Sequence, residues 1–187
     1  MDKTEQINKL ALLSGVIIMV TLTAFGLKLF QSPIPQNLTT WVMWAILNAL
    51  LLRASISAGN KQSWMLSAGA TLGVVFITLI LLSNGEWHWG MVETISVIGA
   101  TVTTVIWKSL GPKRGVIAIV VAMNVAGLPN MYDTYLAPNP EGWWLWAGLA
   151  LACLLAGIGA EKWTVQDRLF PVVNFFFNLT MLILVFL

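Results

Sequence analysis

The feature that most constrains this chain is a series of seven continuous apolar runs, each about 20 residues long. A helix of that length crosses the roughly 30 Å hydrocarbon core of a bilayer. The runs lie at Lys9–Phe30, Leu38–Ser57, Ser63–Leu82, Trp89–Trp107, Gly115–Tyr135, Gly142–Ala160 and Leu169–Leu187. They occupy most of the 187 residues. We therefore expect an all-α polytopic membrane protein in which residues 1–187 form a single transmembrane domain.

The composition excludes the soluble classes of protein, nucleic-acid binders included. Hydrophobic residues make up 58% of the chain and charged residues only 10%, against about 25% charged in a soluble domain. The single cysteine, Cys153, excludes an internal disulfide framework, and the single histidine excludes a His-rich metal site. The short loops hold no cluster of catalytic side chains. We therefore expect no enzyme, no cofactor and no metal.

The positive charges predict the orientation. Of the ten Lys and Arg residues, nine fall in the N-terminal tail and at the second, fourth and sixth breaks between the runs. They are Lys3, Lys9, Arg53, Lys61, Lys108, Lys113, Arg114, Lys162 and Arg168. Only Lys28 falls on the other side, and such an imbalance marks the cytoplasmic face. We expect an integral protein of a plasma membrane, the inner membrane in a bacterium, with a cytoplasmic N-terminus and an external C-terminus.

Three short segments recur in order at an offset of 101–102 residues. The pairs are 25–27 with 126–128, 41–45 with 143–147, and 77–82 with 179–184. Three helices end on the side opposite to their start, so one linking helix must return the chain before a second triplet begins. The pattern predicts two parallel three-helix repeats, 9–82 and 115–187, joined by a linking helix at 89–107.

One part of the second repeat resembles a known signature. Leu128–Tyr135, followed by Glu141, Gly142 and Trp146, is similar to the PQ-loop of the SWEET and semiSWEET clan, with Asn130 where that family has Gln. The stretch Trp143–Phe177 also resembles the end of the PnuC vitamin transporters, which share the 3+1+3 layout. The N-inside orientation suits the PnuC branch better. The resemblance implies a membrane transporter of a small polar solute.

Asparagines lie at the midpoints of three runs. They are Asn48, Asn124 and Asn178, with Asn174 one turn from Asn178 on the same helix face. An amide both donates and accepts hydrogen bonds, so a ring of amides would suit a neutral polyhydroxylated or amide-bearing ligand. Alternatively, each Asn bonds a neighbouring helix and holds the bundle together. The resemblance implies the first interpretation, because SWEET proteins contact sugar through an Asn on the last helix.

Aromatic residues and prolines complete the candidate site. The paired tryptophans Trp41/Trp44 and Trp143/Trp146 exceed what anchoring at the membrane interface requires, and we expect them to border the amides. Proline removes a backbone hydrogen bond within a helix and kinks it. The PQ-loop resemblance implies that Pro129 and Pro171 act as hinges for alternating access.

Two acidic residues and a glycine motif each admit two interpretations. Glu93 is either a carboxylate that couples transport to protons or cations, or a residue at headgroup level; the second is favoured because a linking helix stands apart from the pathway. Asp133 either borders the outer mouth or is a loop-end charge. The motif Gly69–Gly73 allows close helix contact, either within the first triplet or between two copies of the chain.

These observations predict a facilitative or weakly coupled transporter of a small neutral polar solute, such as a sugar, nucleoside or vitamin, working by alternating access. The alternative is a non-transporting seven-helix scaffold or regulatory partner in a membrane assembly. The expected partners are the solute and the lipid bilayer, and no nucleic acid. An open cavity at the level of Asn48, Asn124 and Asn178 favours the transporter, whereas a scaffold fills that space with side chains.

Overall fold

A computed structural model describes residues 3–57, 63–84, 87, 89–160 and 164–187. The helices are α1 (Lys3–Gln31), α2 (Leu38–Ser57), α3 (Ser63–Asn84), α4 (Met91–Ala126), α5 (Leu128–Leu136), the short 3-10 helix η1 (Pro140–Gly142), α6 (Trp143–Gly159) and α7 (Val165–Leu184). Within these ranges there is no strand. The prediction of an all-α membrane protein is confirmed, because six of the helical segments are long and apolar enough to cross a bilayer.

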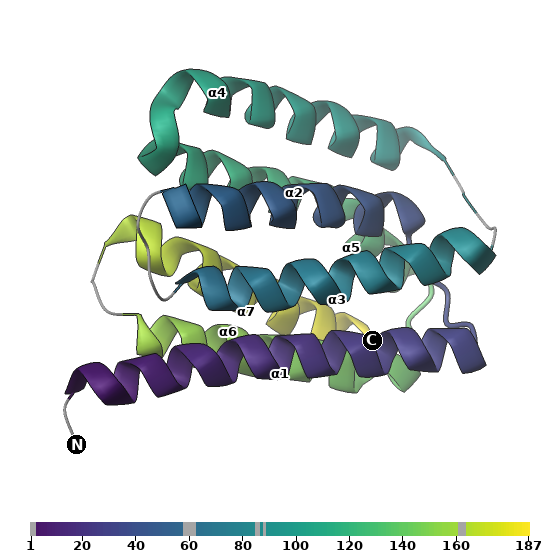
Figure 1. The fold of residues 1–187 in the computed structure, drawn as a ribbon. Coiled ribbons are helices and arrows are strands. Elements are labelled where there is room, and N and C mark those ends of the chain that lie inside the picture. The colour runs from purple at the N-terminus through teal and green to yellow at the C-terminus, as the bar shows by residue number, and fades with distance from the viewer. Residues whose placement is uncertain (1–2, 58–62, 85–86, 88, 161–163) are drawn as a thin grey trace.

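The fourth predicted span is the one that differs from the others. Met91–Val102 is apolar but shorter than a full span, and it belongs to α4, which continues to Ala126. Between Met91–Val102 and the next span, Gly115–Leu136, the ribbon reverses direction (Figure 1). The two arms of α4 lie against each other, because a Cβ added at Gly99 would meet Val125 Cγ1 at 3.0 Å.

The helix boundaries also differ from the prediction in three places. α1 begins at Lys3, before the apolar run, and α7 begins at Val165, before Leu169. The fifth predicted span is divided at Gly127 into the end of α4 and the short helix α5. Pro129 lies in the first turn of α5, where a backbone N–H would have no helical partner in any case. Pro129 therefore starts a helix instead of interrupting one.

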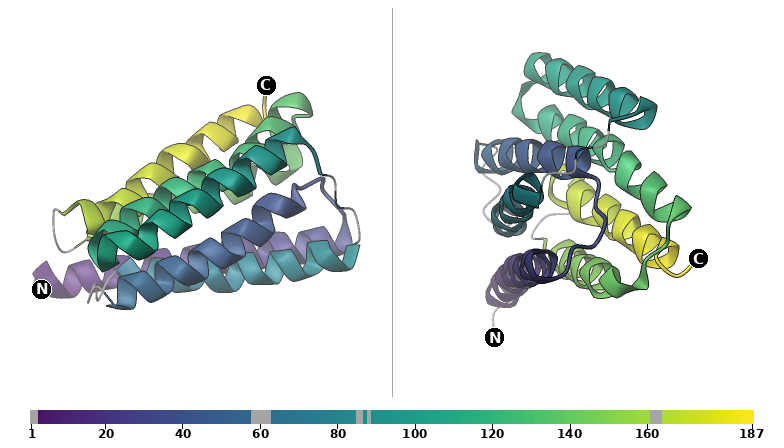
Figure 2. Two further views of the ribbon diagram at one scale, coloured as in Figure 1. Left: turned by 90° about the horizontal axis from the view of Figure 1, so that it is seen from above. Right: turned by 90° about the vertical axis from the view of Figure 1, so that its right-hand side faces the viewer.

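The six spans form a closed ring. α3 packs between α1 and α2, and α7 packs between α6 and α4. The ring closes where α1 meets α6 and where α2 meets α4. The first arm of α4 lies at the edge of this bundle (Figure 2), and many of its side chains are exposed, including Met91, Ile95 and Ile98. The ring encloses an axis to which every span contributes side chains.

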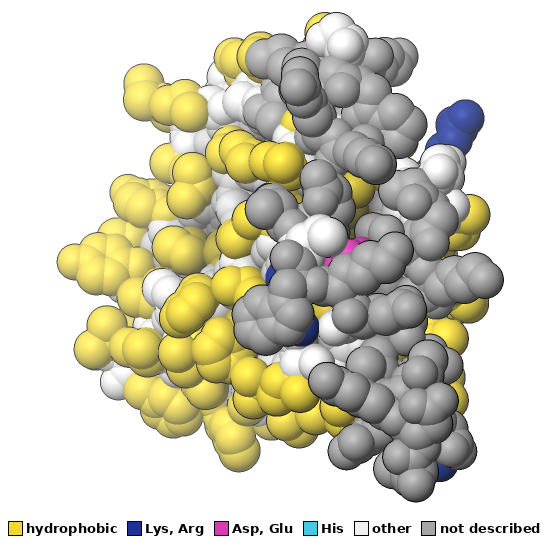
Figure 3. Space-filling view, turned by 90° about the vertical axis from the view of Figure 1, so that its left-hand side faces the viewer, with side chains coloured by type: hydrophobic (Ala, Val, Ile, Leu, Met, Phe, Trp, Pro, Cys, Tyr) yellow, Lys and Arg dark blue, Asp and Glu magenta, His cyan; other side chains and the backbone are white. Residues whose placement is uncertain are grey.

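The two ends of the bundle carry different elements. At one end lie the start of α1, the end of α2, the reversal of α4 and the connection from α6 to α7; the C-terminus lies at the other end (Figures 1 and 2). Figure 3 looks at the first end and shows Lys and Arg side chains among apolar ones. Lys61 and Lys162 lie outside the described residues, as do the side chains of Lys3, Lys108, Lys113 and Arg114.

The Gly69–Gly73 motif packs within the first triplet. A Cβ added at Gly69 would lie 2.3 Å from the Gly15 carbonyl oxygen of α1, and one at Gly73 would lie 2.4 Å from Leu22 Cβ. Backbone cannot yield as a flexible side chain can, so α1 and α3 approach this closely only because both carry glycine at the crossing. This contact fixes one side of the ring.

Gly69→Ala is therefore expected to lower the free energy of unfolding by about 1–3 kcal/mol, the usual range for overpacking. Gly157→Ala is the matched control, because its nearest neighbour, Pro171 Cβ, would be 3.9 Å away. An Ala that fits in a helix gains about 0.5–1 kcal/mol over Gly. Thermal unfolding in detergent should move in opposite directions for the two variants, and equal shifts would contradict the crossing described above.

Candidate functional site

Two cavities lie along the ring. The first, which we call the central cavity, is about 50 Å³ and is lined by residues from all six spans. Its lining includes Asn48, Asn174 and Asn178, together with Trp41 and Trp44. A volume of 50 Å³ holds a water molecule or two and no sugar. The space at the level of the amides is thus nearly filled by side chains, which taken alone favours the scaffold over the transporter.

The amides of the central cavity are oriented by their own helices. Asn48 Nδ2 donates to the Trp44 carbonyl at 2.9 Å, and Asn178 Nδ2 donates to the Asn174 carbonyl at 2.7 Å. Asn174 Nδ2 donates in the same way to the Phe170 carbonyl at 3.0 Å. Asn48 Oδ1 is buried and has no hydrogen-bond partner among the described residues. It is an acceptor left for a donor that enters the cavity.

The other predicted site residues lie elsewhere. Asn124 is not among the residues that line the central cavity, and its Nδ2 donates to the Val120 carbonyl of its own helix at 2.8 Å. Trp146 is buried but lines the second cavity, and Trp143 is 48% exposed. The structure thus brings together three of the four predicted amides and one of the two tryptophan pairs.

The second cavity, which we call the vestibule, is about 720 Å³ and lies towards the end of the bundle where α1 ends and α6 begins. Residues from most of the elements line it: Phe25 and Leu29 of α1, residues 33–36, Leu81 of α3, Glu93 of α4, Asn130, Asp133 and Thr134 of α5, residues 137–139, Gly142 of η1, Trp146 of α6 and Val185. Several rim residues, including Pro33 and Pro138, are exposed. The volume falls within the range of about 300–1,000 Å³ of small-molecule sites.

A polar cluster organised by Asn37 forms one wall of the vestibule. Asn37 Nδ2 donates to both Glu93 Oε1 and Asp133 Oδ2, each at 2.8 Å. Its Oδ1 accepts from the Thr40 backbone N–H at 3.1 Å, so Asn37 is also the N-cap of α2. Its own N–H donates to Asn130 Oδ1 at 3.4 Å. One amide therefore joins the start of α2 to α4 and α5.

The second oxygen of Glu93 is also bonded. Gly90 N–H donates to Glu93 Oε2 at 2.9 Å, and Glu93 lies in the first turn of α4, where the helix dipole favours negative charge. Glu93 is 8% exposed. Both of its oxygens accept N–H donors, which is the hydrogen-bond pattern of a carboxylate. Glu93 thus lines the vestibule.

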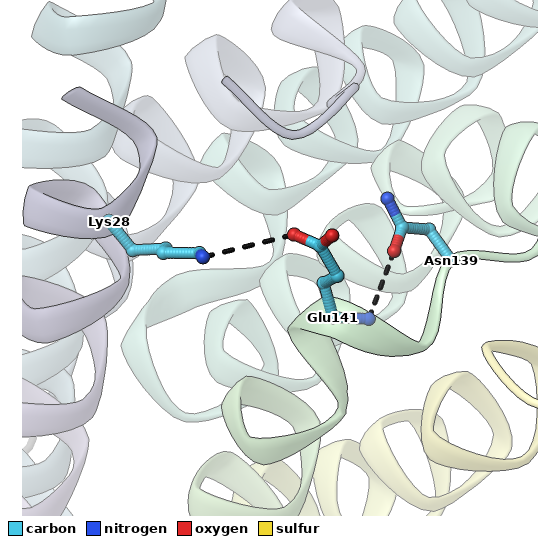
Figure 4. Close-up of polar contacts among 3 residues, drawn as sticks. All are labelled: Lys28, Asn139 and Glu141. Atoms are coloured by element: carbon cyan, nitrogen blue, oxygen red, sulfur yellow. Dashed lines mark hydrogen bonds and ion pairs between the residues drawn. The ribbon is translucent and has the colours of Figure 1, made fainter. Parts of the chain in front are cut away.

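An ion pair lies beside the vestibule. Lys28 Nζ, from α1, lies 3.8 Å from Glu141 Oε2 of η1. Figure 4 shows Lys28 extending towards Glu141, whose backbone N–H donates to Asn139 Oδ1 at 2.9 Å. The side chains of Lys28 and Glu141 are 40% and 63% exposed, and exposed pairs of this kind add about 0–1 kcal/mol. Lys28 is thus engaged with a carboxylate outside the Asn37 cluster.

A chain of four contacting aromatic rings runs from the lining of one cavity to the lining of the other. Phe25 lines the vestibule, whereas Trp41, Trp44 and Phe177 line the central cavity. The ring centroids lie 6.3 Å apart for Phe25–Trp41, 5.3 Å for Trp41–Trp44 and 5.7 Å for Trp44–Phe177. We call these four residues the aromatic layer. It joins the lining of the vestibule to the lining of the central cavity.

Only three buried side-chain N or O atoms lack a hydrogen-bond partner among the described residues: Asn48 Oδ1, Ser96 Oγ and Asn130 Nδ2. Asn48 lines the central cavity and Asn130 lines the vestibule. An unpaired buried polar atom costs about 1–3 kcal/mol, and such atoms gather where a ligand supplies the missing partner. Each cavity thus offers one unpaired hydrogen-bonding atom.

The second predicted hinge, Pro171, lies inside α7. Just before it, Arg168 donates to the carbonyls of Gly157 at 2.8 Å and Ala160 at 3.2 Å, near the end of α6. These bonds satisfy carbonyls that have no partner within the helix. Arg168 therefore holds the start of α7 against the end of α6, while Pro171 removes one backbone bond from α7.

The sequence interpretation missed Asn37 and Thr40. Asn37 follows a Pro-rich turn and directly precedes an apolar run, which is the signature of an N-cap. That signal predicts the bond to Thr40 N–H. It does not predict the bonds to Glu93 and Asp133, since these join residues 56 and 96 positions apart.

No protein-family model, curated protein or solved structure matches this chain.

Proposed function

We propose that this protein transports a small polar solute across the membrane by alternating access, with the vestibule as the open side and the aromatic layer as the closed barrier. The observation that carries the proposal, against the nearly filled central cavity, is the vestibule of about 720 Å³, whose lining residue Phe25 is linked through Trp41 and Trp44 to the lining of the central cavity. The central cavity receives side chains from every span, and it contains an acceptor without a partner, Asn48 Oδ1. A buried acceptor without a partner costs about 1–3 kcal/mol, so its presence in the cavity supports a role in binding.

The helix contacts support a pair of repeats. α3 lies between the other two helices of the first triplet, and α7 takes the same position in the second. In this pairing, the second arm of α4 together with α5 is the counterpart of α1, and α6 is the counterpart of α2. The contact of α1 with α6 is then equivalent to the contact of α4 with α2. We propose two parallel triplets related by a rotation near 180° about the membrane normal. The first arm of α4 would be the linking helix.

This arrangement supports the resemblance to the SWEET and PQ-loop clan, including its PnuC-like branch. Alternating access would then be a movement of one triplet against the other, with Pro129 and Pro171 as hinges. The charge distribution supports a cytoplasmic N-terminus and a vestibule that opens on the external face of a plasma membrane.

The test is solute counterflow in proteoliposomes. Vesicles loaded with one unlabelled solute at a time, from sugars, nucleosides, vitamins and small amines, are given a trace of the same labelled solute outside. A transporter accumulates label above the level of protein-free vesicles for at least one class. No accumulation for any class, with correctly folded protein in the vesicles, would favour the scaffold instead.

A further inference from the structure

We infer that the vestibule binds a small organic ammonium ion, positioned by Glu93 and Asp133. The inference rests on the proposed function for its role as a substrate site, and it departs from the neutral solute that the amides alone predict. Binding itself can be tested without transport.

The first argument is the charge on the vestibule wall. Glu93 and Asp133 both line the cavity, and both accept from the same Asn37 Nδ2. The two accepting oxygens are therefore separated by no more than twice 2.8 Å. Two carboxylates this close repel each other, and the neutral Asn37 bonds both without balancing either charge. A cation in the vestibule would supply the missing positive charge.

No cationic side chain takes that position. The described lining of the vestibule contains no Lys or Arg. The nearby Lys28 instead lies 3.8 Å from Glu141. A positive charge beside the two carboxylates would therefore come from a bound molecule.

The second argument concerns the kind of cation, and it rests on the size of the vestibule and on the residues that line it. A cavity of about 720 Å³ is far larger than a metal ion needs, and no group of three or more His, Cys, Asp or Glu residues lies together among the described residues. Phe25 and Trp146 line the same space, and an ammonium group within about 6 Å of an aromatic ring is attracted to its face. The site suits an organic cation with an apolar or hydroxylated body.

The third argument is Asn130. It is 2% exposed, it lines the vestibule, and its Nδ2 has no partner among the described residues. A free amide N–H donor calls for an acceptor such as a hydroxyl or carbonyl oxygen on the ligand. The ligand class is therefore an amine that also carries an oxygen acceptor, as in an amino sugar or an amino alcohol.

Matched pairs of probes test this inference on the purified full chain in lipid nanodiscs. Glucosamine is compared with glucose, and choline with its uncharged carbon isostere dimethylbutanol, by direct binding near neutral pH. Glucosamine can donate N–H bonds to the carboxylates, whereas choline is attracted by its charge alone; either gain corresponds to roughly tenfold or more in affinity. We expect the cationic member of at least one pair to bind tighter by that factor. Equal affinities within both pairs would overturn the inference.

Conservative variants locate the effect. Glu93→Gln and Asp133→Asn keep the size of the side chain and an oxygen that accepts from Asn37, but remove one charge each. Both should abolish the preference for the cation. Glu141→Gln is the control, because Glu141 is an acidic residue at the same end of the bundle that does not line the vestibule. An equal loss in the control would mean that general surface charge attracts the amine, and would refute the site. If Glu93→Gln fails to fold, the exposed Asp133 still provides the test.

The experiments distinguish a failure of the transport proposal from a failure of the ammonium site. Carboxylate-dependent amine binding without counterflow of any solute would end the transport proposal and leave the ammonium site in place. Counterflow of a neutral solute with no preference for the amine would end the ammonium site and leave transport in place.

Discussion

Replacing Asn37 with Ala is expected to lower the free energy of unfolding by about 3–5 kcal/mol, from a lost helix cap and two lost hydrogen bonds to carboxylates. The change leaves the oxygens of Glu93 and Asp133 facing each other without a shared donor. Chemical or thermal unfolding in detergent measures the loss. Adding Glu93→Gln to this variant should recover part of it, because one of the two repelling charges is then removed.

Asn139→Ala is the matched control for that prediction. Asn139 also caps a helix after a Pro-rich turn at the same end of the bundle, and its side chain accepts only from Glu141 N–H among the described contacts. The cost there should be about 1 kcal/mol, the usual value of a cap. Similar losses for Asn37→Ala and Asn139→Ala would mean that the cluster stabilises the fold no more than a cap does.

Replacing Asn48 or Asn178 with Leu is expected to reduce solute uptake by about tenfold or more while the protein still folds. Leu has a similar volume, but it removes the amide that a solute would bond as it sheds water at the membrane centre, which corresponds to at least one hydrogen bond. Counterflow of whichever solute the panel identifies measures the change, and thermal unfolding checks the fold.

Asn124→Leu is the control for the central cavity. Asn124 lies on a neighbouring span but outside the cavity lining, and its amide nitrogen bonds its own helix. Uptake should be nearly unchanged in this variant. Equal losses for Asn48→Leu and Asn124→Leu would show that amides act through packing, and the central cavity would then have no role in the pathway.

Hydropathy and helix-breaking residues predict most of the fold. A backbone N–H or C=O without a hydrogen bond, or a charge, is so costly in lipid that few structures other than helices can cross the membrane. The positions of α2 and α3 follow directly from the apolar runs. The starts of α1 and α7 cannot be read from the apolar runs, because both helices continue into polar residues outside the apolar region. The division at Gly127 depends on close packing against Phe177 and Trp44, which a Cβ there would meet at 2.6 and 3.0 Å.

The candidate site is less accessible from sequence. Depth along a helix follows from position in the run, so Asn48 and Asn178 are recognisable as mid-membrane amides. The direction in which a side chain points around the helix axis cannot be read from its position in the run. This is why Asn124 lies outside the cavity that Asn48 and Asn178 share. The Asn37 cluster joins a turn, α4 and α5, and contacts between distant segments leave no local pattern. Glu93 was for the same reason interpreted as peripheral.

The most direct test of the transport account is the reactivity of Cys153, the chain's single cysteine. It is 2% exposed and lines the central cavity together with three residues of the aromatic layer. A membrane-impermeant methanethiosulfonate reagent is larger than the 50 Å³ cavity, so labelling requires the axis to open. Alternating access predicts that Cys153 is labelled when the reagent is added to either side of the membrane, with Cys153→Ala as the unlabelled control. Cys153 that stays unmodified from both sides, while the denatured protein is labelled fully, would contradict transport through this axis.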